Sequence, residues 1–460
     1  MFMDRTHTFK KNKLLIPLLA SAFILSSCGT LTNDVTPVKQ MDEFTLLIYM
    51  AGADLESSLI GQRLVWADDD ELYEWNMCGE ATRDIQEILS VPNKPTDVNI
   101  IIQTGGTTEW TPNEYGEYGD YDIDATKIQR HHVGFNQKLV LDQTLDFANM
   151  GAQETLQSFV EYGLTNYPAR RTGLILWGHG GGFSGVCIDS NVVDPNPLLP
   201  DEYDRLFNNE VAGAMENALR NTGHAGEKLE FIGYDACHMG LQDVMEFNSH
   251  YFKYMIATPE EEAGFGWDYD SWIDDLYAKK KTTDILHEIC RGYIQHYDYN
   301  LAGVYQNALH YNNTHVIGYY NLLKFENYRR AWEDMAKHMT ITPDSFNSFN
   351  AILNNSHEYY YGYFDAMSFI TALENDTGFA GKPNASYITA VKEAYNLLAK
   401  EIVRGQKAYN NSGKYNALSF FFPNMSSSYI DNYLNVNPSQ TNFVEWYRFC
   451  VVGRYAFYGY

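Results

Sequence analysis

The sequence predicts an α/β protein in which helices cover both faces of a mostly parallel central sheet. Short continuous apolar runs that end in glycine-containing turns are typical of strands buried on both faces. Segments with helical spacing lie between these runs, and such alternation connects the strands of a parallel sheet. The 460 residues include 45% hydrophobic and 15% aromatic side chains, which indicates a folded core rather than disorder.

The amino-terminal part of the chain alternates strands and helices. Its predicted elements are strand 44–50, turn 51–54 opening a helix, helix 84–89, strand 98–103, exposed acidic loop 113–124, strand or hairpin arm 127–133, helix 154–164, strand 174–177, helix 207–220 and strand 231–235. In helix 207–220, Val211, Met215 and Leu219 recur at four-residue steps and form one apolar face.

Beyond residue 259 the sequence changes to segments rich in Tyr, Asn and Ala. The predicted elements there are helices 271–278, 285–299, 322–339 and 387–404 and a late strand, 416–422. Pro423 ends this strand, and we expect it to add to an edge of the main sheet. The chain is therefore predicted to have a core over 42–270 and a mainly helical region over 271–460.

The amino terminus has the pattern of an export signal. Lysines at 10, 11 and 13 precede the apolar run 14–25, which is shorter than the ~20 residues that a membrane-spanning helix needs. The run closes on Leu-Ser-Ser-Cys at 25–28, which resembles a bacterial lipobox. This resemblance implies that 1–27 is a signal peptide, that Cys28 is lipidated and that 28–41 is a linker. The protein is thus expected in the cell envelope, anchored to a bacterial membrane and either periplasmic or surface-exposed.

Charge and cysteine content exclude several classes of function. A formal net charge of -26 disfavours binding to nucleic acid, and it either favours cationic substrates or only supports solubility. Besides Cys28, the chain has five cysteines without close spacing, which indicates neither a disulfide framework nor a zinc site. At least one thiol should be free.

Two reactive side chains follow predicted strands. Strand 174–177 leads to His179 among glycines, and strand 231–235 leads to Cys237. Because the carboxyl ends of parallel strands meet at one edge of a sheet, we expect the two residues to lie close together. A thiolate beside an imidazole is suited to nucleophilic catalysis, and helical amides following Cys237 would stabilise it. The alternative is a buried core thiol and a histidine that only caps a strand.

Several segments together resemble the clostripain family of cysteine peptidases, in the wider caspase and gingipain-like group. The matching segments are 49–52, 149–151, 166–169, 176–182, 235–240, 264–269 and 418–423. The resemblance covers about residue 44 to 270 and extends more weakly to 423. It implies that 42–270 is a catalytic core folded as a caspase-like α/β/α sandwich.

The resemblance also implies a role for individual residues. Cys237 would be the nucleophile, His179 the general base and acid, and the backbone amides of Gly180 and Cys237 the oxyanion hole. Because the family favours a basic residue before the cut, Asp235 and Asp268 are candidate acids of the first specificity pocket. Asp235 shares a strand face with Cys237, whereas Asp268 could instead cap a helix. Further acids, 260–262, lie nearby.

Two properties of some relatives have weaker support in this chain. No cofactor is required and no metal site is expected, although calcium stays possible through Asp189, Asp194, Asp201 and Asp204 in the predicted loop 189–204. Self-cleavage would need a basic residue between the histidine and cysteine segments. Arg205, Arg220 and Lys228 are the only ones there, and none lies in a clear processing loop.

Three functions are consistent with the sequence. The first is a lipid-anchored cysteine endopeptidase that cuts protein or peptide substrates after Arg or Lys. The second is a catalytically inactive lipoprotein of the same fold that binds peptides or glycans. The third is a cysteine amidohydrolase acting on small amides, because the same pair of residues serves any acyl transfer. The oligomeric state is left open.

Overall fold

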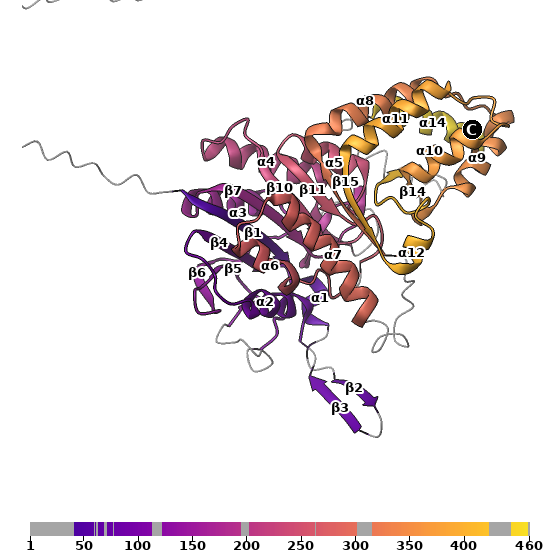
Figure 1. The fold of residues 1–460 in the computed structure, drawn as a ribbon. Helices are drawn as coiled ribbons and strands as arrows, with labels where there is room; N and C mark the ends of the chain where they lie inside the picture. The colour runs from indigo at the N-terminus through magenta and orange to yellow at the C-terminus, as the bar shows by residue number, and fades with distance from the viewer. Residues whose placement is uncertain are drawn as a thin grey trace, which may run out of the picture. The chain divides into compact units, whose positions relative to one another are not determined.

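A nine-stranded sheet organises the chain (Figure 1). Its strands are β1 (Asp42–Ala51), β4 (Val98–Gly105), β5 (Ile128–Val133), β6 (Leu139–Leu145), β7 (Ala169–Trp177), β10 (Leu229–Asp235), β11 (Phe252–Ala257), β12 (Val316–Asn321) and β15 (Ala399–Arg404). They lie in the order β15-β12-β11-β10-β7-β1-β4-β5-β6. The central strands from β11 to β4 are parallel and the outer ones pair antiparallel, so the predicted mostly parallel sheet is confirmed.

The computed structural model describes residues 41–112, 122–194, 202–300, 315–422 and 443–458, except 59, 61, 62, 69, 70, 77 and 263. The predicted signal peptide, the lipidation site Cys28, almost all of the linker and most of loop 113–124 lie outside the described residues. Within these residues, no helix combines the length and apolar character needed to cross a membrane.

Helices cover both faces of the sheet. They are α1 (Ala53–Ser57), α2 (Glu80–Ser90), α3 (Gln153–Asn166), α4 (Asn208–Asn221), α5 (Gln242–Ser249), α6 (Asp270–Tyr277) and α7 (Thr282–Asn300). Successive strand side chains point to opposite faces. In β1, Leu47 and Tyr49 therefore pack with α3, α4 and α5, while Leu46 and Ile48 pack with α2, α6 and α7. The predicted α/β/α sandwich is confirmed.

The carboxy-terminal region is mainly helical, as predicted. Its helices are α8 (Phe325–Lys337), α9 (Pro343–Asn355), α10 (Ala366–Asn375), α11 (Ala385–Leu398), α12 (Gln406–Asn410) and α14 (Val444–Tyr458). A separate sheet is formed by β13 (Glu358–Tyr360), β14 (Tyr363–Asp365) and β16 (Ser419–Phe421). β12 and β15 also come from beyond residue 270, and residues 41–460 form one compact unit. The central sheet is therefore completed by the carboxy-terminal half.

Three sequence-based assignments are wrong. The late strand does not join an edge of the main sheet, because β16 pairs antiparallel with β14. The helix predicted over 387–404 ends at Leu398, since pairing with β12 holds 399–404 extended as β15. Where loop 189–204 was expected, β8 (Val186–Val193) and β9 (Tyr203–Leu206) form an antiparallel pair. A further hairpin, β2 (Arg63–Asp68) with β3 (Glu71–Asn76), was not predicted.

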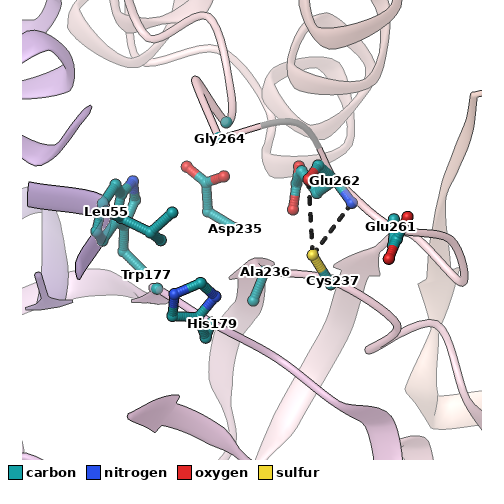
Figure 2. A pocket seen from close by; sticks show the side chains of 11 residues that line it. Leu55, Trp177, His179, Asp235, Ala236, Cys237, Glu261, Glu262 and Gly264 are labelled. Carbon is teal, nitrogen blue, oxygen red and sulfur yellow. Dashed lines mark hydrogen bonds between the residues drawn. The ribbon is translucent and has the colours of Figure 1, made fainter. Parts of the chain in front are cut away.

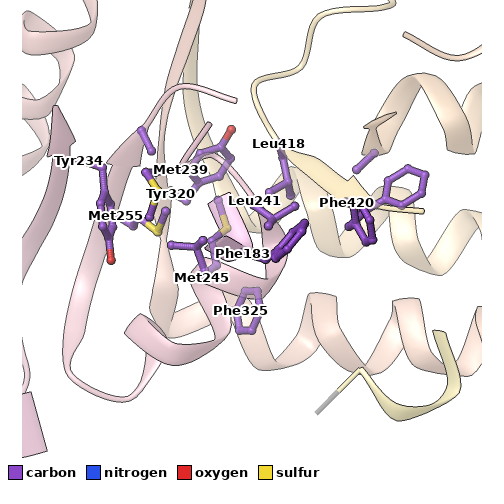
Figure 3. Packing of buried hydrophobic residues seen from close by; sticks show 14 of the residues in the cluster. Phe183, Tyr234, Met239, Leu241, Met245, Met255, Tyr320, Phe325, Leu418 and Phe420 are labelled. Atoms are coloured by element: carbon purple, nitrogen blue, oxygen red, sulfur yellow. The ribbon is translucent and has the colours of Figure 1, made fainter. Parts of the chain in front are cut away.

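The carboxy-terminal region packs against the turns that follow β7 and β10. Leu418 and Phe420 belong to the same buried cluster as Phe183 and Leu241 (Figure 3). The Ser419 amide donates to Gly240 O at 2.7 Å, and its hydroxyl donates to the same oxygen at 3.0 Å. The carboxy-terminal region thereby supports the loops at the carboxyl edge of the sheet.

Candidate active site

Strands β7 and β10 place His179 and Cys237 beside the same cavity. Trp177 pairs with Asp235 in the parallel register, so each reactive residue lies two positions beyond a matched strand end. Gly180 packs on the backbone of Cys237, where any Cβ would clash with the Cys237 carbonyl oxygen. The structure thus brings together the two residues that were predicted to meet.

The cavity has a volume of about 330 Å³. It is lined by Leu55, Trp177, Gly178, His179, Asp235, Ala236, Cys237, Glu261, Glu262, Gly264 and Gly266 (Figure 2). Gly266 has φ +54° and approaches the Asp235 carboxylate so closely that a Cβ would lie 2.7 Å from Oδ1. Glycine is therefore required at 266 for backbone conformation and for space.

The His179 imidazole is oriented by an acid that sequence reasoning did not identify. His179 Nε2 lies 2.6 Å from Oδ1 of Asp54, at the start of α1. This hydrogen bond lowers the pKa of Asp54, so the carboxylate is ionised at neutral pH. With Nε2 held by Asp54, Nδ1 is the ring nitrogen left for proton exchange with a thiol. Ala53, at φ +43°, holds the strained turn that presents Asp54.

The Cys237 sulfur is covered by the backbone of Glu262. The Glu262 amide lies 3.2 Å from Sγ, and Sγ lies 3.6 Å from the Glu262 carbonyl oxygen (Figure 2). Burial raises the pKa of Cys237 to about 12, so the thiol is protonated in this state. The expectation that helical amides follow Cys237 directly is wrong, because α5 begins at Gln242. His238, at φ +62°, turns the chain instead.

The remaining thiols lie away from this cavity. The described cysteines other than Cys237 are Cys78, Cys187, Cys290 and Cys450, and none of these five forms a disulfide. Among them, Cys237 alone is a lining residue of the cavity. The prediction that at least one thiol is free is therefore confirmed.

The two amides predicted to bind an oxyanion are neighbours. Gly180 contacts the Cys237 backbone directly, and Cys237, but not Gly180, is a lining residue of the cavity. Within the described part of the chain, neither amide donates to a backbone carbonyl. Both are therefore available to a developing oxyanion, although that role stays a prediction.

Of the two predicted pocket acids, Asp235 lines the cavity and Asp268 does not. Asp235 is 4% exposed and accepts hydrogen bonds from the Trp267 amide at 3.2 Å and the Tyr269 hydroxyl at 2.9 Å. Burial raises its pKa to about 7. The Asp268 carboxylate instead lies 3.7 Å from His296 Nδ1.

Of the three consecutive acids 260–262, two line the cavity and one does not. Glu262 and Glu261 line the cavity, whereas Glu260 is buried behind it, 3.9 Å from both His315 and His357. Sequence spacing could not separate three consecutive acids. A segment without regular secondary structure gives no periodicity from which to assign their directions.

Two more carboxylates, the buried Asp84 and the half-buried Glu87, lie next to Asp235. Asp84 accepts a 2.6 Å hydrogen bond from the Trp177 indole, and Glu87 accepts from the Tyr269 amide at 2.9 Å. Burial and the charges of Glu87 and Asp235 raise the pKa of Asp84. Because each of these acids makes ionisation of its neighbours more costly, a cation in the cavity would stabilise their ionised forms.

Two of the candidate calcium ligands, Asp189 and Asp204, accept hydrogen bonds within the fold. Asp189 is buried and accepts hydrogen bonds from the amides of Met150 and Asn191, both at 2.8 Å. Asp204 accepts from the Asn149 side chain. Asp201 lies outside the described residues, and among those described no three acids, histidines or cysteines are grouped for metal binding.

The sequence and fold of this chain match known proteins. Residues 65–449 match the model of the clostripain family, peptidases of type C11. The chain is 22% identical to clostripain from Hathewaya histolytica, over 95% of this chain and 89% of that protein. Its fold resembles a secreted C11 cysteine protease from Bacteroides thetaiotaomicron, solved with an irreversible peptide inhibitor, at TM-score 0.58 and 16% identity, covering 89% of this chain and 99% of that one. An inactive zymogen C11 protease from Parabacteroides distasonis matches at TM-score 0.58 and 15% identity, with the same coverage.

Proposed function

The chain belongs to the clostripain family and is a cysteine peptidase, and on that basis we propose that it cleaves after Arg or Lys with Cys237 as nucleophile. The observation that carries this proposal is the cavity itself. It is lined by the thiol of Cys237, the imidazole of His179 and the buried carboxylate of Asp235. A single substrate residue could therefore place its cationic side chain near Asp235 and its carbonyl carbon near Cys237.

The proposed reaction uses His179 twice. Nδ1 accepts the Cys237 proton, and the thiolate attacks the scissile carbonyl carbon while the amides of Gly180 and Cys237 bind the oxyanion. The imidazolium then gives its proton to the leaving amine, and a thioester remains. Water next attacks the thioester as His179 takes its proton. The C–S bond then breaks, the acid is released, and the imidazolium returns its proton to the Cys237 thiolate. Asp54 stabilises the imidazolium in both halves through its hydrogen bond to Nε2.

The preference for a basic residue is supported by the electrostatics of the cavity wall. Burial makes ionisation of Asp235 costly, and a guanidinium or ammonium group in the cavity would add a counter-charge to that of Arg83. A neutral side chain would leave the charge of that carboxylate less well compensated. We expect selectivity of this kind to reach about two orders of magnitude or more, because the wrong substrate does not stabilise the buried charge.

We also propose that the protein is exported and held at the cell envelope by a lipid on Cys28. The lysines and short apolar run of the first 27 residues support export. The relative from Bacteroides thetaiotaomicron is described as secreted. Mass spectrometry of the membrane fraction, with Cys28→Ser as the comparison, would detect the lipid and its loss.

The direct test compares peptide hydrolysis by the wild-type chain, Cys237→Ala and His179→Ala. Fluorogenic peptides ending in Arg, Lys, Asp or norleucine report both activity and preference. We expect either substitution to lower kcat by about 10⁴-fold or more, with Arg or Lys preferred by the wild type. Hydrolysis that persists in folded Cys237→Ala, or a preference for Asp, would contradict the proposal.

A further inference from the structure

Glu262 contacts the nucleophile with its backbone. Both its amide and its carbonyl oxygen lie against the Cys237 sulfur. The amide alone would favour a thiolate, but the carbonyl can accept only from a protonated thiol, and burial dominates the resulting pKa. In this arrangement the Glu262 carbonyl oxygen accepts the thiol proton and its backbone helps to bury the sulfur, while its amide partly offsets the effect of burial on the pKa of Cys237.

The side chain of the same residue lines the specificity cavity. Both Glu262 carboxylate oxygens are buried, and neither makes a hydrogen bond of regular geometry within the described residues. The Ala236 backbone and the Trp267 side chain stabilise its charge in part. Burial and the nearby charge of Asp235 raise the pKa of Glu262 well above its usual range. A buried acid with so little support is the group that a cation entering the cavity would affect most.

The backbone around Glu262 is fixed on either side but not at Glu262 itself. On one side, the His238 amide donates to Glu260 O at 2.9 Å; on the other, the Trp267 amide donates to Asp235. Glu262 belongs to no helix or strand, and its amide hydrogen bond within the described residues goes to the Cys237 sulfur. A shift of Glu262 would therefore break its contacts with the thiol without breaking a sheet ladder.

We propose that Glu262 couples occupation of the cavity by a basic side chain to release of the Cys237 thiol. The inference rests on the proposed function, since it assumes that Cys237 is the nucleophile and that the cavity takes a cation. When the cavity is empty, the Glu262 backbone covers the sulfur. When a guanidinium or ammonium group enters, the Glu262 carboxylate moves toward it and the backbone leaves the sulfur. The thiol can then transfer its proton to His179.

The test measures alkylation of Cys237 by iodoacetamide, followed at that residue by mass spectrometry, with and without n-butylguanidinium. This cation has the shape of an arginine side chain but contains no scissile bond. Its neutral counterpart, n-butylurea, is the ligand control. We expect the cation to accelerate alkylation of the wild-type chain by at least about tenfold, because each unit of thiol pKa changes the thiolate fraction about tenfold. The neutral ligand should leave the rate unchanged.

Substitutions show whether the effect of the cation on Cys237 alkylation depends on Glu262 or only on binding of the cation in the cavity. Glu262→Gln should lose the acceleration while keeping Asp235 to bind the cation, and Glu262→Asp should restore part of it. Glu261→Gln is the comparison variant: it removes a second carboxylate that lines the cavity, whereas the two backbone contacts with the sulfur come from Glu262, so it should keep the acceleration by the cation. Circular dichroism checks that each variant folds.

The possible results distinguish this inference from the proposed function. A cation that leaves wild-type alkylation unchanged or slows it, in a protein whose hydrolysis after Arg requires Cys237, overturns the coupling alone. Acceleration that persists in Glu262→Gln overturns it as well. Hydrolysis that does not require Cys237 overturns the proposed function on which the coupling rests.

Discussion

The two sides of the cavity, the imidazole side with His179 and Asp54 and the thiol side with Cys237 and Asp235, differ in exposure and in how far their side chains are already positioned for catalysis. On the imidazole side, the side chains of His179 and Asp54 are 34% and 71% exposed and already share a 2.6 Å hydrogen bond. On the thiol side, Cys237 is covered by Glu262, and the neighbouring Asp235 is 4% exposed. The base is oriented by an exposed acid, whereas the sulfur of the half-buried nucleophile is covered by backbone and the pocket acid is buried.

This difference indicates which side limits activity. A histidine already oriented by its hydrogen bond to Asp54 gains little from further rearrangement. Desolvation is the largest cause that raises the pKa of both Cys237 and Asp235 and so makes ionisation of each more costly. A cationic substrate would relieve this penalty for the acid, so substrate specificity and activation of the nucleophile should be linked on the thiol side.

The largest effect should come from removing the pocket charge on the thiol side. In Asp235→Asn, we expect kcat/KM for Arg peptides to fall about 10³-fold, while that for norleucine peptides changes little, because only the cation needs the carboxylate. Asp268→Asn is the matched control, since Asp268 does not line the cavity, and it should change either value less than about threefold. Equal losses in the two variants would show that the cavity is not the specificity pocket.

On the imidazole side, Asp54→Asn should have a smaller effect. We expect kcat to fall about 10²-fold with KM nearly unchanged, because an amide still accepts the hydrogen bond but no longer stabilises the imidazolium. Asp97→Asn, at an exposed aspartate paired with Lys279, is the control. Steady-state kinetics at several pH values checks this, and a loss confined to KM would rule out a positioning role.

The pH dependence of kcat/KM should also be set by a residue of the thiol side, Asp235. Because the Asp235 pKa is about 7 and the cation requires the ionised form, kcat/KM for Arg peptides should fall as the pH drops below 7, by about tenfold per unit. Norleucine peptides do not need that charge, so the ratio between the two substrates isolates Asp235 from His179 and Cys237. A ratio that is constant from pH 5 to 8 would contradict this assignment.

The smallest effects should come from the carboxy-terminal supports of the two sides. Tyr363 donates to Gly181 O at 2.9 Å beside the histidine loop, and Ser419 donates to Gly240 O at 3.0 Å beside the cysteine turn. We expect Tyr363→Phe and Ser419→Ala each to cost about 1 kcal/mol of unfolding free energy, which thermal denaturation measures. Tyr361→Phe, at a side chain 58% exposed, should cost nothing measurable. If all three variants behave alike, these contacts do not support the site.

Sequence patterns predicted the central strands and the residues that follow them. Apolar runs such as 98–103 are strands because only a strand buried on both faces needs so continuous an apolar sequence. The same patterns were wrong for 399–404, where pairing with β12 outweighs helical propensity. They were also wrong for the pairing of β16, because strand partners are fixed by contacts between residues distant in the chain.

The sequence alone determined that a histidine and a cysteine each follow a buried strand of an α/β sheet, since apolar runs and side-chain alternation are local properties with a fixed period. Only the tertiary structure showed that Asp54 binds the imidazole, that Glu262 rather than Asp268 lines the cavity, and that Glu262 covers the sulfur. These residues lie in turns and in segments without regular structure. The direction of such side chains depends on the elements packed around them, and no periodic pattern in the chain encodes it.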